Sequence, residues 1–179
     1  KYTLDSGSSL PNIRQQAVGL QSRSIAWWVS EQDKGQTDAI NKGFGRAKGQ
    51  ILAWLNSDDT YEPGAISAAV KYLQGHPEVG MVYGDCNFIN EDGRVIGKFG
   101  AAQTDHRLLR QGYAHIPQQT MFFRADLWKQ VGPLDPSFYF AMDYDLWTRL
   151  SARAPLKYVP QTWANFRLHG DSKTLIAND

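Results

Sequence analysis

Hydrophobic residues occur along this chain in short uninterrupted runs and in longer stretches where they recur at helical spacing. The clearest run is residues 51–55, five apolar residues with no polar residue among them. A strand exposed on one face would alternate apolar and polar residues, so this run predicts a short strand buried on both faces, as in a covered parallel sheet. The run ends at Asn56 and is followed by the acid pair Asp58 and Asp59.

Helical spacing marks the segments that separate such runs. Apolar residues recur from Thr37 and stop at Gly49, which predicts one helix, and the next helix is predicted between Pro63 and Gly75. The expected buried face of that second helix consists of Ile66, Ala69, Val70 and Leu73. A helix predicted over residues 141–153 has its packed face at Met142, Leu146, Trp147 and Leu150. Shorter helices are predicted at 12–20, at 104–109 and from 127 to about 132.

Strand-like runs alternate with these helices and predict the class of fold. They lie at 2–4, at 25–29, from 81 onward, at 118–124, and near Tyr158 and Phe166. Trp27 and Trp28, in the second run, are expected in the core. The Asp92-Gly93 pair between two apolar runs predicts a β-hairpin over 88–96. The alternation predicts an α/β fold with a mostly parallel sheet, helices on both faces, and a hairpin and mixed strands in the C-terminal half.

Composition places few limits on function. Lys and Arg number 19 and Asp and Glu 18, so no overall field favours nucleic acid or an anionic membrane surface. A single cysteine, Cys86, excludes an internal disulfide and a multi-cysteine metal site, which fits a reducing compartment. No apolar run approaches the roughly 18 residues of a membrane span, and there is no signal-peptide pattern. Because Lys1 already adjoins a strand-like run, we expect that N-terminal sequence is missing.

Acidic side chains fall where predicted strands end. Asp5 follows the first predicted strand, and Asp58 and Asp59 follow the third. Parallel strands present their C-terminal ends at one rim of a sheet, so these acids are expected to share a site. Their oxygens suit Mg²⁺ or Mn²⁺ holding a phosphate. The alternative is a simple turn in which Asp58 or Asp59 caps the following helix.

Further polar and aromatic residues each allow two interpretations. Asp143 and Asp145 open a predicted helix, where the helix dipole favours carboxylates. Positions i and i+2 lie on different helix faces, so one acid could cap while the other points into a cleft as a general base. His169 could be a ligand or a surface residue, and Lys42 could neutralise a diphosphate or be solvated. Trp147 could stack against a sugar or pack in the core.

Several short motifs follow one another in an order that one known family shares. They are Asp5-x-x-Ser8, the segment 30–43, Asn56-Ser57-Asp58-Asp59 with Pro63, Gln118-Gln119-Thr120, Gly132-x-Leu134-Asp135, Asp143-Tyr144-Asp145-Leu146-Trp147-x-Arg149 and His169-x-x-Ser172. With these motifs the chain resembles the family 2 glycosyltransferases with a GT-A fold, from Tyr2 to about Ser172. Two positions depart from the family pattern: Asn56 replaces the usual first acid of the metal motif, and Leu10 replaces an acid after the first motif.

The resemblance implies a role for each matching residue. Nucleotide-sugar contacts are implied for Asp5, Asp38, Asn41, Lys42 and Asp58. A divalent metal, Mg²⁺ or Mn²⁺, is implied near Asp58, Asp59 and His169, with the choice between the two acids left open. Asp143 matches the catalytic base of the family. The acceptor side is expected at Gln118, Gln119 and Trp147.

These implied groups suit sugar transfer from a nucleotide-sugar donor. One metal site and one separate base imply direct displacement with inversion. The expected donor is a UDP-, dTDP- or GDP-linked sugar, and the expected acceptor is a saccharide or a lipid-linked acceptor, as in polysaccharide biosynthesis. No nucleic-acid partner is expected. The expected location is cytoplasmic, with peripheral association at the inner face of the membrane and homo-oligomerisation as options.

The whole chain, 1–179, is interpreted as one GT-A-type domain, with a nucleotide-binding half at 1–90 and an acceptor-side half at 91–179. Family members normally have another strand and helix before Tyr2, so we expect this domain to be N-terminally incomplete. The main rival function is a non-catalytic nucleotide- or carbohydrate-binding module of the same fold. A nucleotidyltransferase ranks last, because the sequence has no obvious glycine- and basic-rich triphosphate loop.

Overall fold

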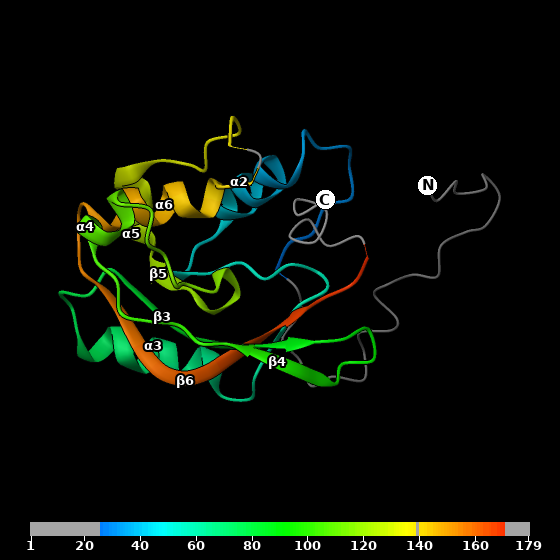
Figure 1. The fold of residues 1–179 in the computed structure, drawn as a ribbon. Coiled ribbons are helices and arrows are strands. Elements are labelled where there is room, and N and C mark those ends of the chain that lie inside the picture. Colours follow the sequence, from blue (N-terminus) through cyan, green and yellow to red (C-terminus); the bar gives the residue numbers. More distant parts are fainter. Residues whose placement is uncertain (1–25, 139, 171–179) are drawn as a thin grey trace. The chain divides into compact units, whose positions relative to one another are not determined.

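The computed structural model describes residues 26–138 and 140–170 (Figure 1). Contacts along the chain divide it into two units, residues 1–32 and 33–179, and every helix and strand given below belongs to the second unit. The strand expected at 2–4, the helix expected at 12–20 and the candidate residue Asp5 lie outside the described residues.

Six strands of the described chain form one sheet. Its main order is β1 (Ile51–Leu52), β5 (Phe122–Arg124), β3 (Met81–Ile89), β6 (Leu156–Arg167) and β2 (Thr60–Tyr61). A further strand, β4 (Val95–Phe99), pairs with β3 from Cys86 onward, whereas β5 pairs with Met81 and Val82 at the start of β3. Because β6 runs along the other side of β3, the latter has three neighbouring strands and forms the centre of the sheet.

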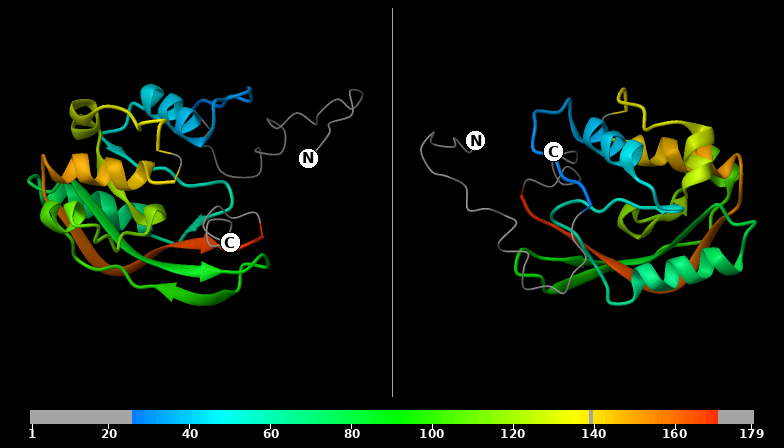
Figure 2. Two further views of the ribbon diagram at one scale, coloured as in Figure 1. Left: turned by 45° about the horizontal axis from the view of Figure 1, so that its top comes forward. Right: turned by 180° about the vertical axis from the view of Figure 1, so that it is seen from behind.

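Helices cover both faces of this sheet (Figures 1 and 2). They are α2 (Gln36–Arg46), α3 (Ala65–Gly75), α4 (His106–Arg110), α5 (Ala125–Val131) and α6 (Met142–Ser151), with a 3₁₀ turn, η2 (Gln118–Thr120). α3 lies on one face, and α2, α4, α5 and α6 lie on the other (Figure 2). None of the helices in the described ranges combines the length and apolar character needed to cross a bilayer.

Side-chain alternation along β3 supplies the two cores. Met81 and Tyr83 are fully buried on the side of α2, α5 and α6, whereas Val82 points to the opposite side, where it packs with Leu73 of α3 and Trp163 of β6. Successive strand residues point to opposite faces, so the part of a strand that has helices on both sides is apolar on both faces, as residues 81–83 are. Helices on both faces were expected from the sequence, and this expectation is confirmed.

Several local predictions are confirmed. The helix expected from Thr37 is α2, although it ends at Arg46 rather than at Gly49. α6 buries Met142, Leu146, Trp147 and Leu150, the packed face that its spacing predicted. The hairpin between β3 and β4 turns at Gly93, whose φ of 81° favours glycine.

Two predictions of burial are wrong. Residues 26–29 form no strand, and Trp28 is 65% exposed. An apolar run becomes a strand only when neighbouring strands take its backbone hydrogen bonds, which composition cannot guarantee. Ile66 was expected on the buried face of its helix and is 53% exposed, because Ala65 occupies the buried position one residue earlier.

The sheet is mixed over the described residues, whereas a mostly parallel one was expected. β1, β3 and β6 run in one direction and β2, β4 and β5 in the other, so only β3 and β6 form a parallel pair. Residues 118–120, expected to begin a strand, form η2 after Pro117, and the two short runs near Tyr158 and Phe166 are one strand, β6. Antiparallel neighbours need no crossover helix, so the alternation of helices and strands did not identify them.

Candidate active site

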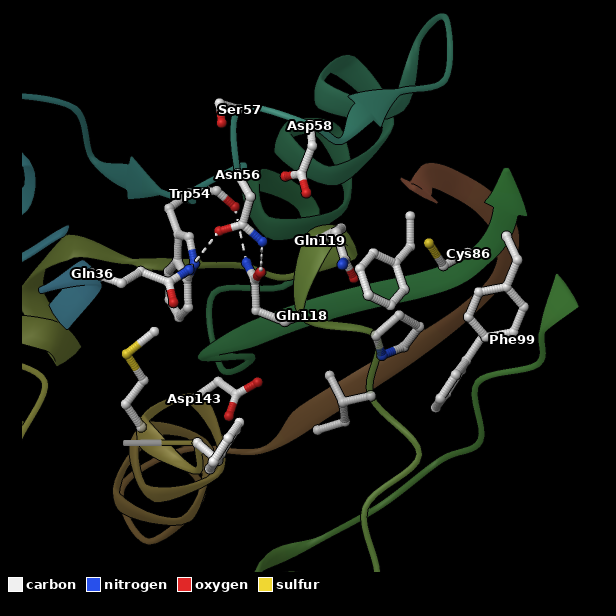
Figure 3. Close-up of a pocket in the computed structure, with 16 residues that line it drawn as sticks. Gln36, Trp54, Asn56, Ser57, Asp58, Cys86, Phe99, Gln118, Gln119 and Asp143 are labelled. Carbon is white, nitrogen blue, oxygen red and sulfur yellow. Dashed lines mark hydrogen bonds between the residues drawn. The ribbon is translucent and has the colours of Figure 1, made fainter. Parts of the chain in front are cut away.

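A cavity of about 680 Å³ opens on the side of the sheet that carries α2 and α6 (Figure 3). Its polar lining comes from the first turn of α2, the loop after β1, η2 and the start of α6. The polar residues are Gln36, Asn56, Ser57, Asp58, Gln118, Gln119 and Asp143. Its apolar lining includes Trp54, Phe88, Phe99, Phe140, Met142 and Phe166. The cavity therefore brings together residues from both halves of the chain.

Asp58 and His169 form a pair at this cavity. Nε2 of His169 lies 3.0 Å from Oδ2 of Asp58, and the two side chains retain 26% and 36% exposure, respectively. His169 lies just beyond the end of β6. Because β6 pairs antiparallel with β2, which directly follows the acid pair, the end of β6 lies next to Asp58 and Asp59. The structure thus joins two of the three residues predicted to lie near a metal.

Asp59 occupies a different environment from its neighbour. It is 5% exposed, its Oδ1 accepts a hydrogen bond from Arg167 N at 3.0 Å, and its Oδ2 accepts one from Asn56 Nδ2 at 3.1 Å. Burial raises the pKa of Asp59 above its ordinary value, against these hydrogen bonds, which lower it. Both carboxylate oxygens are therefore engaged inside the protein. Neither acid caps α3, whose N-cap residue is Gly64.

Asn56 connects the polar residues around the cavity. Its Oδ1 accepts from Gln36 Nε2 at 2.9 Å, and its Nδ2 donates to Gln118 Oε1 at 3.3 Å as well as to Asp59. Gln118 Nε2 in turn donates to Trp54 O at 3.0 Å. An acid at position 56 would lack the donor that Asn56 supplies to Asp59, so the departure from the family pattern satisfies a buried carboxylate.

Asp143 stands at the start of α6 with its carboxylate toward the cavity, on the opposite side from Asp58 in the view of Figure 3. Tyr144 N donates to its Oδ1 at 2.8 Å. Burial raises the pKa of Asp143 despite this hydrogen bond. A carboxylate with a raised pKa is a stronger base, as proton abstraction requires.

Asp145 has a different role from Asp143, as expected for positions i and i+2. Its Oδ2 accepts two hydrogen bonds from Arg149, from Nε at 2.9 Å and from Nη2 at 2.7 Å. The structure therefore directs one acid of the pair to the cavity and the other to an ion pair along the helix.

The three candidate nucleotide contacts on α2 do not line the cavity. Lys34 N donates to Asp38 Oδ2 at 3.0 Å and Lys42 Nζ lies 3.1 Å from the same oxygen; these contacts, the first above all, lower the pKa of Asp38. Asn41 pairs with the backbone of Leu134, donating to its oxygen at 2.8 Å and accepting from its nitrogen at 2.9 Å. Nucleotide binding by these residues stays a prediction.

Two of the three acceptor-side candidates line the cavity, and the third does not. Gln118 and Gln119 line the cavity from η2. Trp147 is 5% exposed and its Nε1 points to Met121 Sδ at 3.1 Å, so its ring packs in the core, the alternative that the sequence left open.

Sequence reasoning missed Gln36 and the aromatic part of the cavity. Phe88 and Phe166 are register partners on β3 and β6, and Phe99 is the partner of Cys86 on β4. The position of Gln36, a polar residue at the start of a helix, was only a weak indication that it belongs to the site. The aromatic residues gave none, because only strand pairing brings them together.

Comparison with known proteins identifies the family. The model described as Glycosyl transferase family 2 matches residues 3–142, more than half of the chain. The chain belongs to glycosyltransferase family 2. An uncharacterized glycosyltransferase of Mycobacterium tuberculosis is 31% identical to this family member over 125 residues, which cover 68% of this chain and 46% of the relative.

Other similar proteins of the family are much longer. Chondroitin synthase of Escherichia coli is 24% identical over 171 residues, which cover 96% of this chain and 25% of the synthase. The chain thus spans less than half the length of either relative. The crystal structure of S. aureus TarS in complex with UDP-GlcNAc superposes with a TM-score of 0.60 at 14% identity, covering 80% of this chain and 42% of TarS. This likeness confirms the GT-A fold predicted for the family member.

Proposed function

We propose that this family 2 chain transfers a sugar from a nucleotide-sugar donor to an acceptor hydroxyl, with inversion at the sugar carbon. The supporting observation is that Asp58, paired with His169, and Asp143 line one cavity although they are distant in sequence. The binding of UDP-GlcNAc by TarS supports a UDP-linked sugar as the first donor to test. Chondroitin synthase among the relatives supports a saccharide acceptor.

A divalent metal is the proposed cofactor, and the atoms at Asp58 and His169 fit one. Carboxylate oxygen suits Mg²⁺ and Mn²⁺, whereas imidazole nitrogen suits transition metals, so the pair favours Mn²⁺. No group of three or more His, Cys, Asp or Glu side chains suited to a metal occurs in residues 26–138 and 140–170, so donor phosphate and water would complete the ligand set. When bound, the ion would stabilise the negative charge of the leaving diphosphate.

Asp59 is not proposed as a ligand. Its two oxygens accept hydrogen bonds from Arg167 N and Asn56 Nδ2 in a buried place. A metal there would have to compete with those donors for the carboxylate lone pairs, at a position that is only 5% exposed. Asp58 is therefore the acid proposed to hold the ion directly.

Asp143 is the proposed general base. The acceptor oxygen forms a bond to the sugar carbon as the bond from that carbon to the diphosphate oxygen breaks, and the hydroxyl proton passes to Asp143. Because Tyr144 N already binds Oδ1, Oδ2 is the atom proposed to take the proton. Attack from the side opposite the diphosphate inverts the sugar carbon, which requires the base and the metal pair to stand apart across the cavity.

The test measures nucleoside diphosphate release from UDP-, dTDP- and GDP-linked sugars with saccharide acceptors, with Mn²⁺ or with EDTA. Release is expected only with the metal. Asp143→Asn is expected to lower kcat by about 10²–10⁴-fold, since it removes the base, while the calorimetric Kd of the donor stays within about twofold. Asp58→Asn is expected to weaken metal-dependent donor binding. Asp92→Asn, at an exposed acid in the β3–β4 turn, is the matched control and should leave both quantities unchanged.

Three outcomes would contradict the proposal at different points. Turnover that survives Asp143→Asn would exclude this residue as the base. Release that is unaffected by EDTA would exclude the metal. Metal-dependent donor binding without transfer to any acceptor would favour the non-catalytic binding module.

A further inference from the structure

The turn at residues 131–134 is held from two sides by side chains of helices that border the cavity. On one side, Asn41 of α2 uses both ends of its amide: Nδ2 donates to Leu134 O at 2.8 Å, and Oδ1 accepts from Leu134 N at 2.9 Å. Two bonds in opposite directions fix the rotation of the amide as well as its distance. α2 is thereby fastened to the turn in one orientation.

Arg149 of α6 holds the same turn from the other side. Its Nη1 donates to Val131 O at 2.7 Å and to Gly132 O at 3.1 Å, and its Nη2 donates to Pro133 O at 3.0 Å. Some of these carbonyls belong to the end of α5, where no intrahelical donor remains for them. Asp145 binds the guanidinium at two nitrogens and so fixes its plane.

The clamped turn joins the two helices next to the cavity. α2 contributes Gln36 to the lining and α6 contributes Asp143, whereas no residue of the turn lines the cavity. The first turns of the helices also touch directly, because Thr37 Oγ1 donates to Met142 Sδ at 2.9 Å. The bonds of the turn therefore affect the site only through the placement of α2 and α6.

We propose that Asn41 and Arg149 are positioning residues that hold Asp143 in place for proton transfer by clamping the 131–134 turn between α2 and α6. This inference rests on the proposed function, since it takes Asp143 as the base. It differs from the nucleotide contact that family resemblance implied for Asn41. Using that amide for a nucleotide would break both bonds to Leu134 and leave its backbone groups unpaired, at a cost of about 1–3 kcal/mol each.

Two conservative variants test the clamp without truncating a side chain. Asn41→Asp keeps the shape but places a carboxylate oxygen against Leu134 O, and Arg149→Lys keeps the charge but loses the planar fork that binds three carbonyls. Each is expected to lower kcat by about 10–100-fold through misplacement of the base, with the donor KM changed by less than about twofold. The double variant is expected to lose little more than either single variant, because both act through one turn.

Hydrogen exchange provides a readout that needs no activity. Amides of residues 141–146 are expected to exchange faster in both variants, while those of β3 remain as protected as in the unmodified chain. Arg153→Ala, at an exposed arginine just beyond α6, is the matched control and should change neither exchange nor kcat.

The outcomes separate this inference from the proposed function. If no donor supports transfer by the unmodified chain, the proposed function fails, and exchange at 141–146 still decides whether the turn holds α6. An Asn41→Asp variant with unchanged exchange and a donor KM raised more than about tenfold would overturn the clamp in favour of a nucleotide contact. Additive losses of kcat in the double variant would also overturn it, because independent actions add.

Discussion

The adjacent residues Asp58 and Asp59 show how much of the site depends on single side chains. The sequence placed the acid pair at the end of a strand but left open which acid binds a metal. The fold separates them: Asp58 borders the cavity beside His169, and Asp59 is buried with both oxygens hydrogen-bonded. The hydrogen bonds from Arg167 N and Asn56 to Asp59 cause that difference. Arg167 is 108 residues from Asp59, and no local sequence pattern predicts such a remote partner.

The two acids are expected to affect stability unequally. Asp59→Ala would leave Arg167 N without its acceptor and remove one of the two acceptors of Asn56 Nδ2, so it should lower the free energy of unfolding by about 1–3 kcal/mol. Asp58→Ala removes only a half-exposed contact with His169 and should change that free energy by less than about 1 kcal/mol. Urea unfolding followed by circular dichroism measures both. Equal losses would contradict the assignment of Asp59 to a structural role.

The pH dependence of turnover should reflect the raised pKa of Asp143. A general base works only when deprotonated, and burial raises the pKa of this carboxyl above 3.8, so kcat should fall on the acid side at a higher pH than for an ordinary aspartate. The pH profile of kcat at saturating donor and metal measures this limb. It should vanish from the residual activity of Asp143→Asn. An acid limb that stays unchanged in Asp143→Asn would exclude Asp143 as its source.

Among the elements, helices could be predicted best because their signals are local. The buried face of α6 follows from spacing alone, and the short helix expected at 104–109 is α4, which Asp105 caps through a hydrogen bond from Leu108 N at 2.8 Å. Elements whose shape depends on remote partners could not be predicted. The η2 turn is an example, since Thr120 donates from Oγ1 to Gly84 O at 2.9 Å and accepts from Gly84 N at 3.2 Å.

Two substitutions compare a helix residue that is packed in the core with one whose sequence spacing predicted burial but whose side chain is exposed. Phe44 of α2 is 6% exposed, with ring centroids 5.5–5.7 Å from Trp54, Phe123 and Trp128. Phe44→Ala should therefore cost about 3–5 kcal/mol in the free energy of unfolding. Ile66→Ala, on α3, should cost less than about 1 kcal/mol, because its side chain is already 53% exposed. Denaturant unfolding of both variants measures the contrast, and a similar cost for the two would contradict the packing described.

At the scale of the whole molecule, the α/β class and the family could be predicted, and the order of strands could not. The family was predictable because each motif is a short local segment and the motifs follow one another along the chain. The order of strands was not, because neighbours such as β1 and β5 are remote in sequence and pair through Ile51 and Arg124. The close approach of β6 to its neighbour β3 also joins remote residues: a Cβ at Gly84 would lie 2.4 Å from Gln161 O. Apolar periodicity predicts that a residue is buried, but it does not predict which remote segment packs against it.

The central place of β3 has a consequence for how the protein is made. β3 pairs with β5 and β4 on one side and with β6 on the other, and β6 extends to Arg167. During synthesis, a nascent chain that has reached α5 already contains β3 with one long edge unpaired and its apolar residues uncovered. The sheet is complete only after β6 has left the ribosome, so this edge of β3 stays unpaired until then. Ribosome-bound intermediates stalled before residue 156 should be the species most prone to aggregate.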